Sequence, residues 1–482
     1  MRSPRPSPLL PTALFLAVAF LGGCARPLGP GFHFDSRNVQ IRAAEEPRRI
    51  HLRVADHMEN SGDRPLEALD VRVAEQLVAE SQLPRITVGE HETPLVPAVA
   101  ADPGLMRASL EPVWEQREPR EIVTEWDLVS GAHGRIAATD RAFYILDPDA
   151  LPAWQPPRGV FTRGGPIADR ESLLVYAPPD FRVLGPGRLD RTRREDQRTV
   201  YRFRQRKEQP FLPFVIAGRY QERLAGTPPG LVSYWTFEPL ESQQAEPAAL
   251  RLANAAKAME DYFGPVRNDK VAVRIVEAPR ELPSDFGEEG APGAISFPGG
   301  VLLDPRGFAQ GLASDAVAEL AEYELARTWF GWHVGLRPEA EILMGRGMGL
   351  FAVVVSAAAR GAGEREAAVA SLLQRYDRAQ RTAADRSLVG LPGEYSRAER
   401  ITTGYKAALF LISLEELCGR NNLRAALTHI VRALGGDQTG TEELRAALEA
   451  ECGRDLAEVF RAWLNRPGLP EEFSARVRRG GN

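Results

Sequence analysis

The sequence predicts a multidomain chain in the order β, then α/β, then α, because the spacing of its hydrophobic residues changes twice. Up to about residue 225, hydrophobic and polar residues alternate in short runs that turn residues separate. A period of two is typical of antiparallel strands in a β-sandwich. Strand and helix patterns then mix, and from Met344 onward almost every segment has a helical period.

We place a β-sandwich domain at residues 49–228, where Ile50, Leu52 and Val54 begin the alternation. An α/β domain is expected at residues 229–370, followed by a helical region at residues 371–482.

Within the α/β domain, Leu250 to Phe263 has the spacing of an amphipathic helix, and Gly264-Pro265 ends it. Val271 to Val276 and Val301 to Leu303 are expected to be strands, and Ser314 to Phe330 a helix.

The composition is that of a globular protein, with 44% hydrophobic and 26% charged residues. The net charge is −5 and no block of like charge stands out, so no basic face is expected. We therefore expect no nucleic-acid partner.

The N-terminus predicts export. Arg2 and Arg5 precede an apolar run, which ends in Leu21-Gly22-Gly23-Cys24. This pattern is typical of a secretory signal peptide, here residues 1–23. Its end resembles the bacterial lipobox, which implies that Cys24 is acylated and holds the chain on a lipid bilayer. Ala25 after it implies the outer membrane, facing the periplasm, and residues 24–48 are expected to be a Pro- and Gly-rich tether.

Two further cysteines, Cys418 and Cys452, are each followed by glycine, so each is expected to end a helix. An exported chain permits a disulfide between them, but two buried free thiols remain an alternative.

One stripe of the predicted helix 314–330 carries charged residues among hydrophobic ones. The stripe consists of Val317, Leu320, Ala321, Glu324, Arg327 and Thr328. Buried charges are costly unless they are paired, so this stripe is the candidate functional segment.

The segment Tyr323 to Gly331 resembles the His-Glu-Leu-Ala-His-Gln-Trp-Phe-Gly motif of the aminopeptidase N and leukotriene hydrolase family, zinc peptidases of the gluzincin type. Tyr262–Pro265, Gly293–Phe297 and Trp463–Pro470 resemble other family segments in the same order. The resemblance covers roughly residues 49–475. It implies an N-terminal β-sandwich, a thermolysin-like gluzincin domain and C-terminal helices.

The zinc ligands of the family are not retained. By resemblance, Tyr323 and Arg327 stand at the two histidine positions and Arg346 stands at the third-ligand glutamate. Glu324 keeps the general-base position. A guanidinium has no lone pair, and one placed about 4 Å from a divalent ion costs about 8 kcal/mol at an effective dielectric near 20. Zinc is therefore not expected at this site.

Two other family positions also differ. Ser296 stands where the family has the glutamate that binds the substrate's α-amino group, and Gly404 stands at the transition-state tyrosine. Tyr405 lies one residue out of step, and a small shift of the chain would bring it to the catalytic position. We further expect an arginine, preferably Arg346, to pair with the carboxylate of Glu324 in place of the metal.

The sequence thus predicts a lipoprotein of the cell envelope with a peptidase fold and no cofactor, which binds a peptide or protein without cleaving it. One alternative is an active aminopeptidase or other hydrolase that uses zinc or non-standard residues. Another is a structural envelope component whose cleft has no present use.

Overall fold

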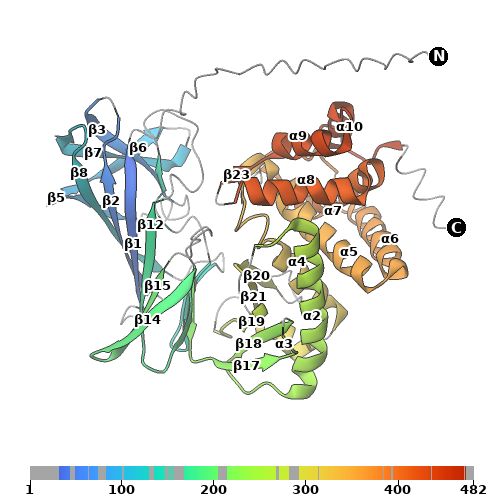
Figure 1. Ribbon diagram of the computed structural model, residues 1–482, viewed down its shortest axis with the longest axis horizontal. Helices are drawn as coiled ribbons and strands as arrows, with labels where there is room; N and C mark the ends of the chain where they lie inside the picture. The colour runs from blue at the N-terminus through green and yellow to red at the C-terminus, as the bar shows by residue number, and fades with distance from the viewer. Residues whose placement is uncertain are drawn as a thin grey trace, which may run out of the picture.

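The computed structural model describes residues 32–473, apart from gaps at 44–48, 63, 74–82, 100–101, 130–134, 147–150, 152, 156–167, 205–213, 229, 267–270, 282–292, 313, 384, 392–393, 436 and 472. The predicted signal peptide and Cys24 lie outside the described residues. A sheet-rich N-terminal region is followed by a largely helical C-terminal part, in the predicted order (Figure 1).

Three sheets form the N-terminal region. Their strand orders are β14-β15-β12-β1-β2-β8-β4-β5, β13-β16-β10-β9 and β11-β3-β7-β6. The strands are β1 (His33–Ala43), β2 (Arg49–Glu59), β3 (Leu66–Arg72), β4 (Arg85–Val88), β5 (His91–Thr93), β6 (Leu95–Val99), β7 (Asp102–Trp114), β8 (Pro119–Val129), β9 (Ile136–Ala138), β10 (Ala142–Ile145), β11 (Ala153–Gln155), β12 (Arg170–Ala177), β13 (Arg182–Leu184), β14 (Arg188–Glu195), β15 (Arg198–Arg204) and β16 (Val215–Gly218).

The expected tether at residues 24–48 is wrong for its second half, because His33–Ala43 forms strand β1. This strand pairs antiparallel with β2 and parallel with β12. Val39 and Ile41 are buried in the sheet core, but the polar run around Arg37 hides their alternation in the sequence.

The middle region has one five-stranded sheet, in the order β17-β18-β19-β21-β20. Its elements are β17 (Gln221–Ala225), β18 (Leu231–Thr236), α2 (Ser242–Phe263), β19 (Val271–Glu277), β20 (Ala294–Phe297), β21 (Gly300–Leu303), α3 (Pro305–Gln310), α4 (Asp315–Ala326), β22 (Gly335–Leu336), the 3₁₀ turn η2 (Pro338–Ala340), the π-helix η3 (Glu341–Gly347) and α5 (Met348–Arg360). Because β17 belongs to this sheet, the middle region begins before the predicted boundary at residue 228.

The C-terminal part packs its helices against α2, α4 and α5 in one large hydrophobic core. Its elements are α6 (Ala362–Ala379), α7 (Arg397–Cys418), α8 (Arg420–Ala433), β23 (Gln438–Thr439), α9 (Thr441–Cys452) and α10 (Ala457–Leu464). The stretch Pro338–Arg360 is long and apolar enough to cross a membrane. However, 72% of its 18-residue apolar window is buried inside the protein, so it serves as a core helix.

A separate aromatic core joins the β region to the middle region. Tyr144 and Phe214 of the β region contribute to it together with Trp235, Phe297 and Trp332. Phe214 packs its ring 5.5 Å from Phe297 and 6.3 Å from Trp332. The segment that carries Trp332 is therefore fixed from both sides.

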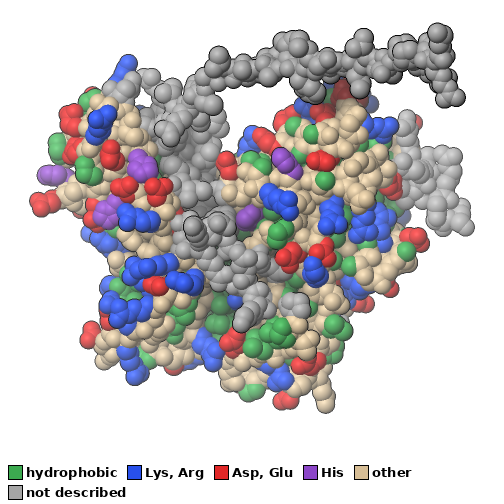
Figure 2. All heavy atoms as spheres, viewed as in Figure 1, with side chains coloured by type: hydrophobic (Ala, Val, Ile, Leu, Met, Phe, Trp, Pro, Cys, Tyr) green, Lys and Arg blue, Asp and Glu red, His purple; other side chains and the backbone are tan. Residues whose placement is uncertain are grey.

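The hairpin of β14 and β15 brings arginines of its two strands side by side, so the expectation that no basic face exists is wrong at this edge. Figure 2 shows Lys and Arg side chains collected where these strands lie. Arg191 stands directly opposite Arg202, and Arg188 opposite Arg204. Asp190 pairs with Arg204 at 3.1 Å and with Arg188 at 3.5 Å.

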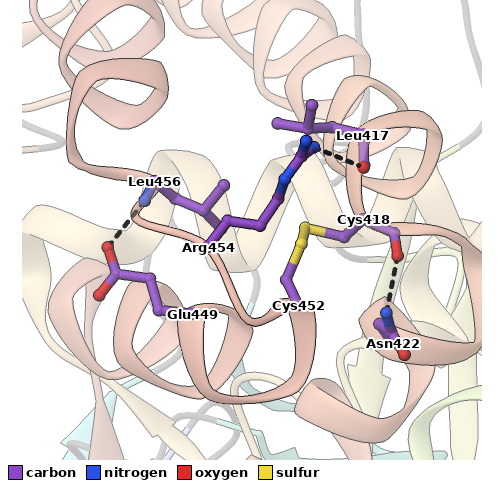
Figure 3. The surroundings of a disulfide bond; sticks show 7 residues. All are labelled: Leu417, Cys418, Asn422, Glu449, Cys452, Arg454 and Leu456. Carbon is purple, nitrogen blue, oxygen red and sulfur yellow. Dashed lines mark hydrogen bonds between the residues drawn. A yellow bond between two sulfur atoms is a disulfide. The ribbon is translucent and has the colours of Figure 1, made fainter.

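A disulfide joins Cys418 at the end of α7 to Cys452 at the end of α9, with their Cα atoms 5.2 Å apart (Figure 3). Both helices end before the predicted glycines, Gly419 and Gly453. The amide of Asn422 donates to the Cys418 carbonyl at 2.8 Å. The disulfide thus joins the ends of α7 and α9, and the Asn422 hydrogen bond joins the end of α7 to α8.

We predict that Cys452→Ser lowers the free energy of unfolding by about 3 to 4 kcal/mol, because the bond closes a loop with a sequence separation of 34 residues. Urea denaturation of the variant and the parent protein measures this loss. Under reducing conditions the two proteins should unfold alike. Equal stability under oxidising conditions would contradict the prediction.

Candidate functional site

Helix α4 carries Tyr323 and Glu324 and ends at Ala326, with Arg327 as its C-cap, so it is shorter than the helix expected up to Phe330. Paired charges fix its position. Glu322 is fully buried, and its Oε1 accepts from Arg251 Nε of α2 at 3.0 Å and from Arg360 Nη1 of α5 at 3.5 Å. Such pairs tie helices together because separating them would leave a buried charge unpaired. The helix is therefore held on both flanks independently of the face that carries Tyr323, Glu324 and Arg327.

Glu324 faces the edge strand of the five-stranded sheet. Its Oε2 accepts a hydrogen bond from the backbone N–H of Ser296 in β20 at 3.1 Å. The carbonyl of Ser296 accepts from Nε1 of Trp332 at 3.2 Å. The structure thus brings together Glu324 and Ser296, two of the sequence-predicted site residues, and adds Trp332.

Arg327 pairs with a residue that the sequence analysis missed. Its Nη2 donates to Oε1 of Glu341 at 3.0 Å, and both side chains are largely buried. The nearby carboxylate of Glu341 holds the pKa of Arg327 above its usual value. The cation at this position is therefore neutralised inside the protein.

Gly345 leaves the space that this ion pair needs. A Cβ atom at residue 345 would lie 2.7 Å from Oε1 of Glu341, so any side chain there would displace the carboxylate. Gly349 has the same role for Tyr323, whose ring carbon Cε2 would lie 2.5 Å from a Cβ at residue 349. The glycines around Arg346 thus accommodate the residues that stand at the metal-ligand positions.

The expected ion pair between Glu324 and Arg346 is not formed. Among the described residues, no Lys or Arg nitrogen lies within 4.0 Å of the Glu324 carboxylate, which binds the Ser296 amide instead. The Cβ of Arg346 lies close to Gly404 of α7, and burial, together with the charge of Arg346, lowers the pKa of Arg400. The structure therefore gives no reason to expect that truncating Arg346 would strand a buried carboxylate.

Gly404 of α7 lies beside Arg346, and Tyr405 follows it on the same helix. Gly404 stands opposite Arg346, whereas Tyr405 packs partly buried against the main hydrophobic core. The neighbouring Lys406 is fully buried and donates to the carbonyls of Arg386, at 3.0 Å, and Arg466. Lys406 thus anchors the C-terminal segment to α7, which is a structural role.

The residues at the three ligand positions do not fit zinc. Arginine has no lone pair to offer, and burial raises the pKa of Tyr323, so its phenol stays protonated near neutral pH. Over the described part of the chain, the one group of three or more His, Cys, Asp or Glu side chains with a metal-binding arrangement is in the β region, at His33, Asp35 and Asp169.

Comparison with solved structures shows which class of protein shares this fold. The chain matches an M1 zinc metallopeptidase from Deinococcus radiodurans with a TM-score of 0.62 and 17% identity, over 91% of this chain and 95% of that one. A mutant of an M1 zinc metallopeptidase from this organism matches with a TM-score of 0.63 and 17% identity, over 91% and 96%. A mutant bound to a Tyr-Ser-Ala substrate, from the same organism, matches with a TM-score of 0.62 and 16% identity, over 91% and 95%.

No protein-family model and no curated protein sequence matches the chain. The structure therefore resembles M1 zinc metallopeptidases in fold, as the motifs predict. At these identities the fold is what the comparison shows.

We predict that Glu341→Gln lowers the free energy of unfolding by about 3 kcal/mol, because it leaves the Arg327 guanidinium without its carboxylate. In an Arg327→Met background the same change should cost at least about 1 kcal/mol less. Denaturant unfolding of the four proteins in this double-mutant cycle measures the coupling. As a control, Glu458→Gln removes an exposed pair with Arg461 and should cost under about 1 kcal/mol. Additive effects of the two site substitutions would disprove the pairing.

Proposed function

We propose that this chain is a lipid-anchored protein of the cell envelope that uses a peptidase fold to bind peptide or protein segments without hydrolysing them. The observation that carries the proposal is the Arg327–Glu341 ion pair, which lies where the family resemblance requires a zinc ligand. A neutralised, packed arginine at that position supports loss of the metal rather than its exchange for another ion.

The parts of the site that could bind a peptide remain close together. The Ser296 amide, the Glu324 carboxylate and the Trp332 indole form one hydrogen-bonded group beside the edge strand β20. Both backbone groups of Ser296 are already bonded and β20 is buried, so a peptide would have to replace these hydrogen bonds to pair with this edge strand. Arg346 adds a positive charge that has no carboxylate within 4.0 Å among the described residues.

We predict that the purified full-length protein does not accelerate the hydrolysis of aminoacyl-anilides, with or without added zinc, and that Glu324→Gln leaves this rate unchanged. Glu324 has no metal-bound water to activate at a site lined by arginine. Colorimetric assays measure the rate. Turnover that Glu324→Gln abolishes would instead support the alternative, an active hydrolase that uses non-standard residues.

The same preparation tests binding. Screening immobilised short peptides should find ligands whose affinity falls at least tenfold in Arg346→Gln and is unchanged in the surface control Glu458→Gln. A screen without any ligand would favour a structural envelope component.

The anchor has a separate test. We predict a diacylglyceryl mass on Cys24 in the N-terminal fragment, because Leu21-Gly22-Gly23 precedes it after an apolar run. Mass spectrometry of the protein from its bacterial host measures this mass, and Cys24→Ser should release the protein from the membrane fraction. An unmodified Cys24 would contradict the anchor but would leave the proposal about the binding site intact.

A further inference from the structure

His33, Asp35 and Asp169 converge at one end of the eight-stranded sheet, far from α4. His33 begins β1, and Asp169 directly precedes β12, which runs parallel to β1. The amide of Asp169 donates to the carbonyl of Phe34 at 3.0 Å, so the backbones of the two segments are already joined. The register of β1 against β2 shifts between Phe34 and Ser36, which leaves Asp35 as an extra residue there. Such bulges re-aim a side chain, and they are common next to functional sites.

Both carboxylates approach the same imidazole nitrogen. Nε2 of His33 lies 3.1 Å from Oδ1 of Asp35 and 3.3 Å from Oδ2 of Asp169, and the three side chains offer ligand atoms within 4.8 Å of one another. One ring nitrogen carries at most one proton, so it can donate a well-directed hydrogen bond to only one of the two aspartates. Ligands about 2.0 to 2.1 Å from a tetrahedral metal are separated by about 3.3 Å, which is close to the observed spacing.

The local charge also favours a cation. Within the described residues, neither aspartate has a Lys or Arg nitrogen within 4.0 Å, so His33 is the basic side chain that both of them contact, although Arg170 lies nearby. A neutral imidazole with its proton on Nδ1 would direct the Nε2 lone pair toward the carboxylates, and a cation placed between them would remove the repulsion.

We propose that His33, Asp35 and Asp169 form a binding site for one divalent cation of the zinc class, independent of the proposed function. An imidazole with two carboxylates suits Zn²⁺ and similar transition metals better than Mg²⁺ or Ca²⁺, which prefer oxygen ligands alone. The side chains are 46 to 67% exposed, so water completes the coordination. The ion fastens the start of β1 to the start of β12.

Isothermal titration of the untagged full chain with Zn²⁺ tests the site. We expect one saturable site that Mg²⁺ does not occupy. His33→Ala and Asp169→Asn, which lie on different segments, should each weaken Zn²⁺ binding at least tenfold. His51→Ala is the matched control, because among the residues that the structure describes His51 contacts one carboxylate, Asp127, at 3.0 Å on the same sheet. The His51→Ala variant should bind Zn²⁺ with the same affinity as the unmodified chain.

Thermal unfolding gives a second readout, since bound Zn²⁺ should raise the melting temperature of the unmodified chain and of His51→Ala but not of Asp169→Asn. Circular dichroism confirms that each variant is folded. No stoichiometric binding, or equal binding by His33→Ala and His51→Ala, would overturn the proposal. Neither result would bear on peptide binding at Glu324.

Discussion

The Arg327–Glu341 ion pair is the interaction on which the rest of the candidate site depends. An arginine held in a helix interface needs a carboxylate nearby, because an unpaired charge there costs several kcal/mol. Glu341 supplies that carboxylate from the π-helical segment before α5, and Gly345 leaves room for it. Arg327, Glu341 and Gly345 therefore fit together, and Gly349 leaves room in the same way for the ring of Tyr323.

Other buried charged side chains also connect the helices of this part of the chain. Glu322 joins α4 to α2 and α5, and Lys406 joins α7 to the C-terminal segment through backbone carbonyls. A zinc ion in a metallopeptidase would also connect α4 to the next helix. Here the Arg327–Glu341 ion pair connects the end of α4 to the π-helical segment η3, which precedes α5.

The sequence predicted the order of the regions and several individual elements because local periodicity encodes them. The alternation at Ile50 to Val54 became part of β2, and the predicted helix ending at Phe263 was confirmed. Glu341 could not be found this way, because its role depends on a chain reversal after Gly331, where φ is +132°. The same limit explains the wrong partner chosen for Glu324. Spacing along a helix identifies the face of a residue, whereas the Ser296 amide comes from a strand edge distant in the sequence.

The group of His33, Asp35 and Asp169 in the β region likewise could not be found from spacing along the sequence. His33 was assigned to a tether, and no spacing within the sequence relates it to Asp169. Parallel pairing of β1 with β12 brings them together. The pairing of β1 with β12 thus places the proposed cation site in the β region, outside the helix that resembles a zinc motif.

Anomalous diffraction at the zinc absorption edge, from crystals of the full chain grown with Zn²⁺, tests the central claim most directly. The account predicts no anomalous peak among Tyr323, Arg327 and Arg346, and a guanidinium of Arg327 in contact with Glu341. A strong peak beside Glu324, with Arg327 displaced from Glu341, would contradict it.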